Sequence, residues 1–385
     1  MSNVIETLAD LIRINSVNPE WGGPGERGVA DYVTRFFQSV GLDVIEEDVI
    51  PGRPNLMIQL PGRDRNRSVL LEVHMDTVSV DDMTIPPFEP EIRDGLMYGR
   101  GACDDKGGLA TMMHAVCDLH VSGEIPVVDV ILAVVADEEH HHRGVNKLIE
   151  TLQASDRPLP ESAIVAEPTE LRVARANKGV LRFSIITRGK SAHSAKPHLG
   201  VNAITAMAPV ILALEKYEAQ LAENSHSLVG PATSSTGLIE GGAQINFVPE
   251  NCKITIDRRL IPGEKADDVM RDYEAVLEKV RTENNEIEVR IEPANRLADE
   301  AMETPADAEV VTSSSKILDR LGLKPDPIGV PYGCDCTKLS RAGIPSVIFG
   351  PGSIDQAHGA VEFVEIDQVE KALDFYRQFL LDFGS

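Results

Sequence analysis

The chain has 385 residues, more than the ~100–200 residues of a typical domain, so we expect at least two domains. Hydrophobic residues make up 42% and charged residues 25%, a globular composition that excludes wholesale disorder. The 61 acidic residues outnumber the 37 basic ones, and the net charge of -24 disfavours nucleic acid and anionic membrane as partners.

The N-terminal segment and the cysteines favour a cytoplasmic protein. Glu6, Asp10 and Arg13 interrupt the first apolar positions, so no secretory signal is predicted, and no run of about 18 apolar residues predicts a membrane span. The five cysteines are odd in number and scattered, which disfavours a disulfide framework and fits a reducing compartment.

Helical and strand-like patterns alternate in the first part of the chain. Apolar residues at helical spacing predict a helix near 4–12, capped by Ser2 or Asn3, and another over 26–40 that stops before Gly41. The further elements expected are strands at 44–49, 55–60, 69–73, 127–136 and 163–166, and helices at about 109–119 and 144–153. This alternation predicts an α/β domain, a mixed sheet with helices on both faces.

The pattern changes after about residue 179. The order becomes strand 180–187, helix 201–222, strands 236–247 and 251–259, helix 264–282 and strand 286–292. This βαββαβ order is typical of a ferredoxin-like domain. Helix 306–321, strand 344–349 and helix 366–381 follow. We therefore expect residues 179–293 to be inserted into a larger domain made of 1–178 and 294–385.

The segment VLLEVHMDTV ends an apolar strand with His74 and Asp76. Residues two apart share a face of a strand, so Asp76 can hydrogen-bond the His74 ring and leave its other nitrogen for a metal. A core histidine beside a carboxylate explains this motif about equally well.

Two acidic segments follow. In YGRGACDDKGG, Asp104 and Asp105 precede a helix, where solvated acids would be an ordinary finding. In VILAVVADEEHHHRG, acids follow a buried strand, which is costly unless a cation or hydrogen bonds compensate, or the strand has already reached solvent.

Two more candidate ligands lie further along: Glu167 in IVAEPTE and His358 in VIFGPGSIDQAHGAVEF. Five such motifs after apolar strands are hard to attribute to chance, because open α/β sheets gather their ligand sites at the carboxyl ends of strands. Imidazole with carboxylate suits zinc, cobalt or manganese.

In combination, these motifs resemble the dinuclear zinc amidohydrolases and metallopeptidases that include acetylornithine deacetylase, succinyl-diaminopimelate desuccinylase, aminoacylase and glutamate carboxypeptidase. The resemblance extends from about residue 5 to 381. It implies a catalytic α/β domain with an inserted lid through which two copies form a homodimer.

The resemblance also implies two divalent cations, zinc or else cobalt or manganese. Asp104 would bridge them through a turn with a cis peptide to Asp105. His74 and Glu167 would bind one cation, and Glu139 and His358 would bind the other; these ligands come from the motifs quoted above. Asp76 would orient His74, and Glu138 would be the general base.

Further roles are implied for the lid and one loop. His193, in GKSAHSAKPHLGVNAI, would reach the partner's active site and polarise the substrate carbonyl. Asn246 would lie near the substrate, and Arg259 in DRRLIPG would bind a substrate carboxylate, although Arg258 is easily confused with it. The loop from Gly350 to Gly352 would offer backbone N–H groups to substrate.

The expected substrate is a small N-acylated amino acid. GPGSIDQAH, AEPTELRVARANKG and DRRLIPGE are most similar to acetylornithine deacetylase, which makes ornithine and acetate in arginine biosynthesis. A desuccinylase, or an aminoacylase or dipeptidase, is the alternative, and a non-catalytic binding protein ranks lowest. One departure from the family pattern is the run His140–His142, where small residues are common.

Overall fold

The computed structural model describes residues 3–385, which divide into two compact units. The first unit runs to Arg175 and also includes Thr304–Ile328 and Cys334–Ser385. The second comprises Ala176–Glu303 and Gly329–Gly333. A two-part unit with a smaller unit inserted into it is the arrangement expected from the sequence.

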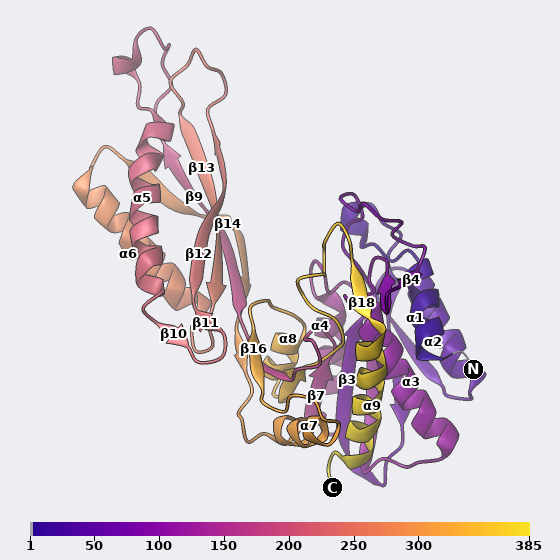
Figure 1. Cartoon of the computed structure of the whole chain (residues 1–385). Helices are drawn as coiled ribbons and strands as arrows, with labels where there is room; N and C mark the ends of the chain where they lie inside the picture. Colours follow the sequence, from indigo (N-terminus) through magenta and orange to yellow (C-terminus); the bar gives the residue numbers. More distant parts are fainter. Residues whose placement is uncertain (1–2) are drawn as a thin grey trace. The chain divides into compact units, whose positions relative to one another are not determined.

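The first unit contains the N-terminal elements and the C-terminal helices (Figure 1). Its elements are α1 (Val4–Arg13), η1 (Pro19–Trp21), α2 (Arg27–Ser39), β1 (Val44–Ile50), β2 (Arg53–Leu60), β3 (Asp64–His74), β4 (Glu91–Arg93), β5 (Leu96–Tyr98), α3 (Lys106–Ser122), β6 (Val128–Val135), α4 (Arg143–Ala154), β7 (Ser162–Val165), α7 (Glu309–Arg320), α8 (Cys336–Arg341), β17 (Ser346–Ile348), β18 (Phe363–Glu365) and α9 (Ile366–Asp382). The strands β8 (Ala174–Asn177) and β16 (Ile328–Val330) contain the boundaries between the units.

The main sheet of the first unit is mixed. Its strands follow the order β1-β2-β6-β3-β7-β17, in which β1, β2 and β6 pair antiparallel and β6, β3, β7 and β17 pair parallel. Every residue of β6 is buried, as expected for a strand covered on both faces. The predicted mixed sheet with helices on both faces is confirmed.

Strand β3 supplies side chains to both faces of this sheet. Val69, Leu71 and Val73 join a core that includes α1, α2, α3 and α9. Because strand side chains alternate, Glu72 and His74 project to the opposite face. Helices α4 and α8 contact each other and the sheet strands β6 and β7. Period-two alternation thus separates the main core from the face that carries the first metal-ligand candidate.

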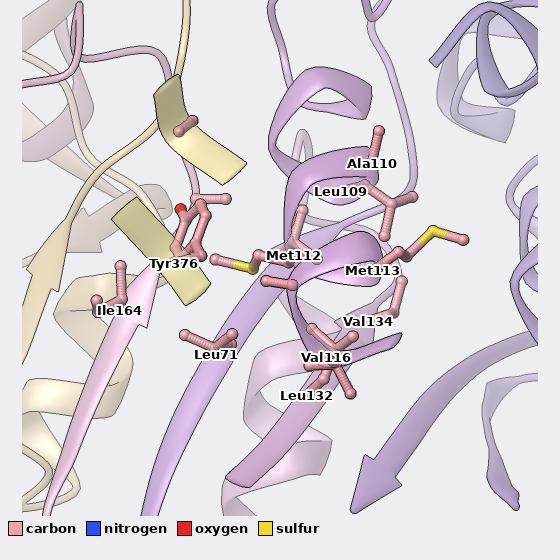
Figure 2. Packing of buried hydrophobic residues seen from close by; sticks show 14 of the residues in the cluster. Leu71, Leu109, Ala110, Met112, Met113, Val116, Leu132, Val134, Ile164 and Tyr376 are labelled. Atoms are coloured by element: carbon pink, nitrogen blue, oxygen red, sulfur yellow. The ribbon is translucent and has the colours of Figure 1, made fainter. Parts of the chain in front are cut away.

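Helix α1 of the main core begins where its sequence predicts. Asn3 caps α1, since its side chain accepts a hydrogen bond from the Glu6 N–H while the Glu6 carboxylate accepts one from the Asn3 N–H. The alternative cap, Ser2, lies outside the described residues. Figure 2 shows Met112 of α3 beside Tyr376 of α9, and both belong with Leu71 of β3 to the buried cluster of this layer.

The second unit has the predicted ferredoxin-like order. Its elements are β9 (Gly179–Arg188), η2 (Pro197–Leu199), α5 (Ala203–Leu221), β10 (Ser225–His226), β11 (Gly230–Pro231), β12 (Thr233–Gly241), β13 (Asn251–Leu260), α6 (Ala266–Glu283), β14 (Glu288–Asp299) and β15 (Met302–Glu303). The sheet order β12-β13-β9-β14 is antiparallel throughout, and α5 and α6 cover one face of it (Figure 1). Among the described residues, no helix of this unit covers the other face.

Two predicted boundaries need correction. The strand expected at 236–247 is β12, which ends at Gly241 because Gly242 adopts a positive φ of 75° and turns the chain. The second unit continues past residue 293 because β14 stays paired with β9 as far as Asp299 opposite Val180. Hydrophobic periodicity does not indicate which strands pair or how far the pairing extends.

The described part of the chain, residues 3–385, holds no helix long and apolar enough to cross a membrane. All five cysteines are free and buried. The sequence likewise predicted no disulfide framework.

Candidate metal centre

The candidate ligands of the first unit lie where parallel strands end. His74 is the last residue of β3, Glu138 and Glu139 follow β6, and Glu167 follows β7. Because these strands are parallel neighbours, their carboxyl ends meet at one edge of the sheet. His358 comes to the same edge on the long loop between β17 and β18.

Asp104 lies at the middle of this group, with one carboxylate oxygen toward each histidine. Its Oδ1 is 2.9 Å from His74 Nε2, and its Oδ2 is 3.1 Å from His358 Nε2. His358 Nε2 is also 3.2 Å from Glu139 Oε2. The groups His74–Asp104–Glu167 and Asp104–Glu139–His358 each have ligand atoms within 4.8 Å of one another. They share Asp104, so their arrangement suits two cations with one bridging carboxylate.

The turn that carries Asp104 is held by a buried ion pair. Glu362 Oε1 accepts hydrogen bonds from the Cys103 N–H at 3.0 Å and the Asp104 N–H at 3.2 Å, while Arg100 donates to its Oε2 at 2.6 Å. The peptide between Asp104 and Asp105 is cis, as the family resemblance implied. Neither Arg100 nor Glu362 was singled out from the sequence, because they lie 262 positions apart.

His74 is oriented differently from the expectation. Its Nδ1 hydrogen-bonds the backbone carbonyl of Asp76 at 3.0 Å, whereas the Asp76 carboxylate lies 3.7 Å away. The carbonyl accepts only from a protonated Nδ1, so Nε2 is still left for a metal. The Asp76 carboxylate instead accepts the N–H groups of Glu138 at 3.0 Å and Glu139 at 3.2 Å. Asp76 therefore positions the loop after β6.

A second buried network supports the same loop. Asn18 donates to Asp76 at 2.8 Å and to Asp137 at 3.0 Å. Arg53 forms a bidentate pair with Glu26, both bonds 2.6 Å long, and also reaches Asp137 at 3.0 Å. In the sequence, Asp137 is one of the acids of VILAVVADEEHHHRG that follow a buried strand. Asn18 and Arg53 both donate to Oδ1 of Asp137, which lowers the cost of burying this carboxylate, whereas its Oδ2 has no hydrogen-bond partner among the described residues.

Two carboxyls of the centre, Glu167 and Glu139, are less well compensated. Burial raises the pKa of Glu167 well above its usual value, and nearby Asp104 adds to the shift. Burial and Asp104 likewise raise the pKa of Glu139, whose Oε1 has no hydrogen-bond partner among the described residues. Although burial opposes it, hydrogen bonds from His358 and His74 lower the pKa of Asp104. Such a buried, under-neutralised set of oxygen and nitrogen donors fits divalent cations such as zinc.

Glu138 is buried and stands beside these ligands without belonging to either group around Asp104. Burial raises its pKa to about 8 in the absence of metal ions, despite an opposing effect of His142. Its Oε1 lies 3.5 Å from His142 Nδ1, which in turn is 2.8 Å from Asp335 Oδ1. A carboxyl with a pKa near neutrality can both take and return a proton.

The candidates in the second unit separate into two places. His193 and Asn246 are exposed on adjacent loops, joined by the Ser194 N–H donating to the Asn246 carbonyl at 2.9 Å. Arg259 lies near the far end of β13, on the face opposite α5 and α6, 2.7 Å from Asp257. Arg258 is fully buried and pairs with Glu264, so its environment differs from that of Arg259.

The glycine loop after β17 does not match its predicted role. The N–H of Gly350 donates to Thr169 Oγ1 at 3.1 Å, and the N–H of Gly352 donates to Gln368 Oε1 at 2.8 Å. Both donors are thus engaged within the chain and are not free for substrate. Gly350 has a packing reason instead, since a Cβ there would lie 2.7 Å from the Glu167 carbonyl oxygen.

Comparison with known proteins now identifies the family. The model of peptidase family M20/M25/M40 matches residues 70–382. The chain belongs to this family. The family resemblance read from the motifs is confirmed, and the chain is a hydrolase of amide bonds in a family for which metal dependence is typical.

Relatives within the family carry different names. An acetylornithine deacetylase of Myxococcus xanthus is 28% identical over 371 residues, 94% of this chain and 93% of its own. A succinyl-diaminopimelate desuccinylase of Cereibacter sphaeroides is 28% identical over 389 residues, 98% of each.

Solved structures share the fold. A tripeptidase of Staphylococcus aureus has a TM-score of 0.81 at 20% identity and covers 98% of this chain and 97% of its own. A dinuclear metal-binding M20 peptidase of Bacillus subtilis has a TM-score of 0.74 at 15% identity, covering 98% and 96%.

Proposed function

We propose that this M20 hydrolase removes the acyl group from N-acetyl-L-ornithine, using two divalent cations held around Asp104. The observation that supports it most is the placement of Asp104, with one oxygen toward His74 and the other toward His358. His74 and Glu167 would hold one cation, and Glu139 and His358 the other. When bound, these cations would polarise the amide carbonyl and make a water molecule nucleophilic near neutral pH.

Glu138 is the general base in this proposal. It takes a proton from the water that attacks the amide carbon and returns that proton to the leaving amine as the C–N bond breaks. Asp76 fixes the loop of Glu138 through two backbone N–H groups. Two products result, a carboxylic acid and an amine, and no acyl-enzyme is needed.

The second unit would supply the remaining groups from two different copies of the chain. The loops of His193 and Asn246 lie beside Asn251, at the start of β13. Arg259 follows Asn251 by eight residues on the same strand, which is roughly 26 Å along an extended chain. A small amino acid is too short to touch both ends of one such unit. We propose that Arg259 binds the substrate carboxylate, while His193 and Asn246 serve the centre of a partner chain.

Exposed apolar side chains support the homodimer. Strand β12 is at the edge of its sheet, where Leu238 and Ile239 are 61% and 57% exposed. The adjacent helix α5 exposes Ile204 and Leu212. Unpaired edge strands with apolar side chains are surfaces that another chain covers. We propose that two copies pair through β12 and α5.

The choice of acyl group rests on similarity. The sequence phrases AEPTELRVARANKG, DRRLIPGE and GPGSIDQAH and the Myxococcus xanthus relative favour acetylornithine. The Cereibacter sphaeroides relative keeps the succinyl substrate as the second candidate.

The test is a substrate comparison. Purified protein loaded with zinc, cobalt or manganese is assayed on acetylornithine, succinyl-diaminopimelate and a set of dipeptides, with kcat/KM as the readout. The proposal expects acetylornithine to be hydrolysed best. A higher kcat/KM for either other class reassigns the substrate, and no hydrolysis of any of them overturns the proposed function.

A further inference from the structure

A third group of potential metal ligands lies beside the centre, on residues that the mechanism does not use as ligands. Glu138, His142 and Asp335 bring ligand atoms within 4.8 Å of one another. Glu138 follows β6, His142 precedes α4, and Asp335 precedes α8. All three belong to the first unit, and Asp335 is fully buried.

The spacing of this third group matches that of the two groups around Asp104. His142 Nδ1 is 2.8 Å from Asp335 Oδ1 and 3.5 Å from Glu138 Oε1. The corresponding distances around Asp104 run from 2.9 to 3.2 Å. Zinc ligands at about 2.0–2.2 Å in tetrahedral geometry lie about 3.4 Å apart, so only small shifts would seat a cation.

Unpartnered oxygens point to a missing positive charge here. Asp335 Oδ2 is buried and has no hydrogen-bond partner among the described residues, although Oδ1 of the same carboxylate faces His142. Both oxygens of Glu72, on the same strand face as His74, are also buried without a partner among those residues.

We propose that Glu138, His142 and Asp335 form a third, inhibitory divalent-cation site. The inhibitory effect rests on the proposed function, in which Glu138 is the general base. A cation bound to Glu138 would occupy the lone pair that must accept the proton. Occupancy of this site would stop turnover without displacing either cation at Asp104. His142 belongs to the third site and not to the ligands around Asp104, so it would make the enzyme sensitive to excess metal.

The test measures bound zinc and activity on the same samples of the full chain. Zinc per chain is determined by equilibrium dialysis and elemental analysis over rising free zinc. The wild-type protein is expected to bind two equivalents tightly and a third more weakly, and to lose activity as the third binds. His142→Asn is the main variant, because asparagine tolerates the positive φ of 55° at this position.

Losing an outer partner of a ligand already costs about 10- to 100-fold in metal affinity, so losing His142 should weaken the third equivalent at least as much. His142→Asn is expected to keep two equivalents and to resist excess zinc, as is Asp335→Asn. The matched control is His141→Ala, which removes an exposed imidazole from the same loop and should bind like wild type.

Saturation of the wild-type chain at two equivalents or fewer would overturn the third site, as would a third equivalent that persists in His142→Asn. Loss of the third equivalent in His141→Ala instead would place it at the loop tip and overturn the assignment. Stoichiometry is measured without substrate, so a failed substrate assay leaves this test intact.

Discussion

Asp104 is the residue on which the proposed chemistry of this chain depends most. A carboxylate can bridge two cations only if each of its oxygens faces a different ligand set, which is the geometry at His74 and His358. The motifs marked both histidines and the aspartate, because each follows or precedes a recognisable element. The sequence could not place Asn18, Arg53 or Glu362, whose roles arise from contacts across 27 to 262 positions of the chain.

Glu138→Gln is predicted to separate metal binding from turnover. Glutamine keeps the size of the side chain but cannot accept the proton, so kcat should fall about 10²- to 10⁴-fold while two zinc ions remain bound. Kinetics and elemental analysis on one preparation measure both quantities. Glu139→Gln is the contrast, since it should lose a cation as well as activity. Wild-type kcat in Glu138→Gln would remove Glu138 from the mechanism.

The carboxyls of the centre also predict a pH dependence of stability. The folded-state pKa of Glu138 is raised from 4.5 to about 8, chiefly by burial, and those of Glu139 and Glu167 shift the same way. A raised pKa contributes stability that is present below about pH 4.5 and is lost as the pH rises through 8.

Zinc should therefore raise the Tm more at pH 8 than at pH 5, because it replaces protons that the metal-free centre holds at low pH. Thermal unfolding with EDTA or with zinc at both pH values measures this difference. Glu167→Gln is expected to reduce it. An equal zinc-induced rise in Tm at the two pH values would contradict the assignment of these carboxyls.

At the scale of elements, the long helices and strands follow from periodicity. The buried strand β6, the amphipathic helices α1 and α9 and the βαββαβ order were all predictable. The three-residue strands β4, β5 and β18 and the short helix α8 were not, because they are too short to show a period. Yet α8 begins just after Asp335, so a part of the site depends on an element without a sequence signal.

The turn before α3 provides a prediction at this scale. Glu362→Gln would leave Arg100 buried without its carboxylate and weaken the acceptor of the Cys103 and Asp104 N–H groups. We expect a loss of about 3 kcal/mol in the free energy of unfolding. We also expect zinc affinity about 10- to 100-fold weaker.

Denaturant titration and zinc dialysis measure the two effects. Glu370→Gln, an exposed position on α9, is the control and should change neither. A Glu362→Gln protein that keeps wild-type stability and zinc affinity would show that the ion pair does not hold the Asp104 turn.

For the whole molecule, sequence order predicted an inserted unit, but only the structure shows where its candidate functional residues lie. His193 and Asn246 are on loops beside one end of β13, and Arg259 is near the other. This separation could not be predicted from distance along the sequence. Asn246 is closer in the chain to Arg259 than to His193, although it lies beside His193 in the structure. The separation is the reason for proposing a site shared between two chains.

Complementation tests the shared site. His193→Ala and Glu138→Gln are each expected to be nearly inactive while remaining dimeric. After the two are mixed and allowed to exchange subunits, half of the dimers are hybrids with one intact site, so activity should return to about a quarter of wild type. Activity that stays at the level of the separate variants, with hybrids confirmed by mass spectrometry, would contradict a site made from two chains.

The most direct measurement of the central claim is anomalous diffraction at the zinc edge from crystals of the zinc-loaded protein. We predict two strong peaks on opposite sides of the Asp104 carboxylate, one beside His74 and Glu167 and the other beside Glu139 and His358. A single peak that does not contact Asp104, or peaks elsewhere with none between these residues, would contradict a centre of two bridged cations.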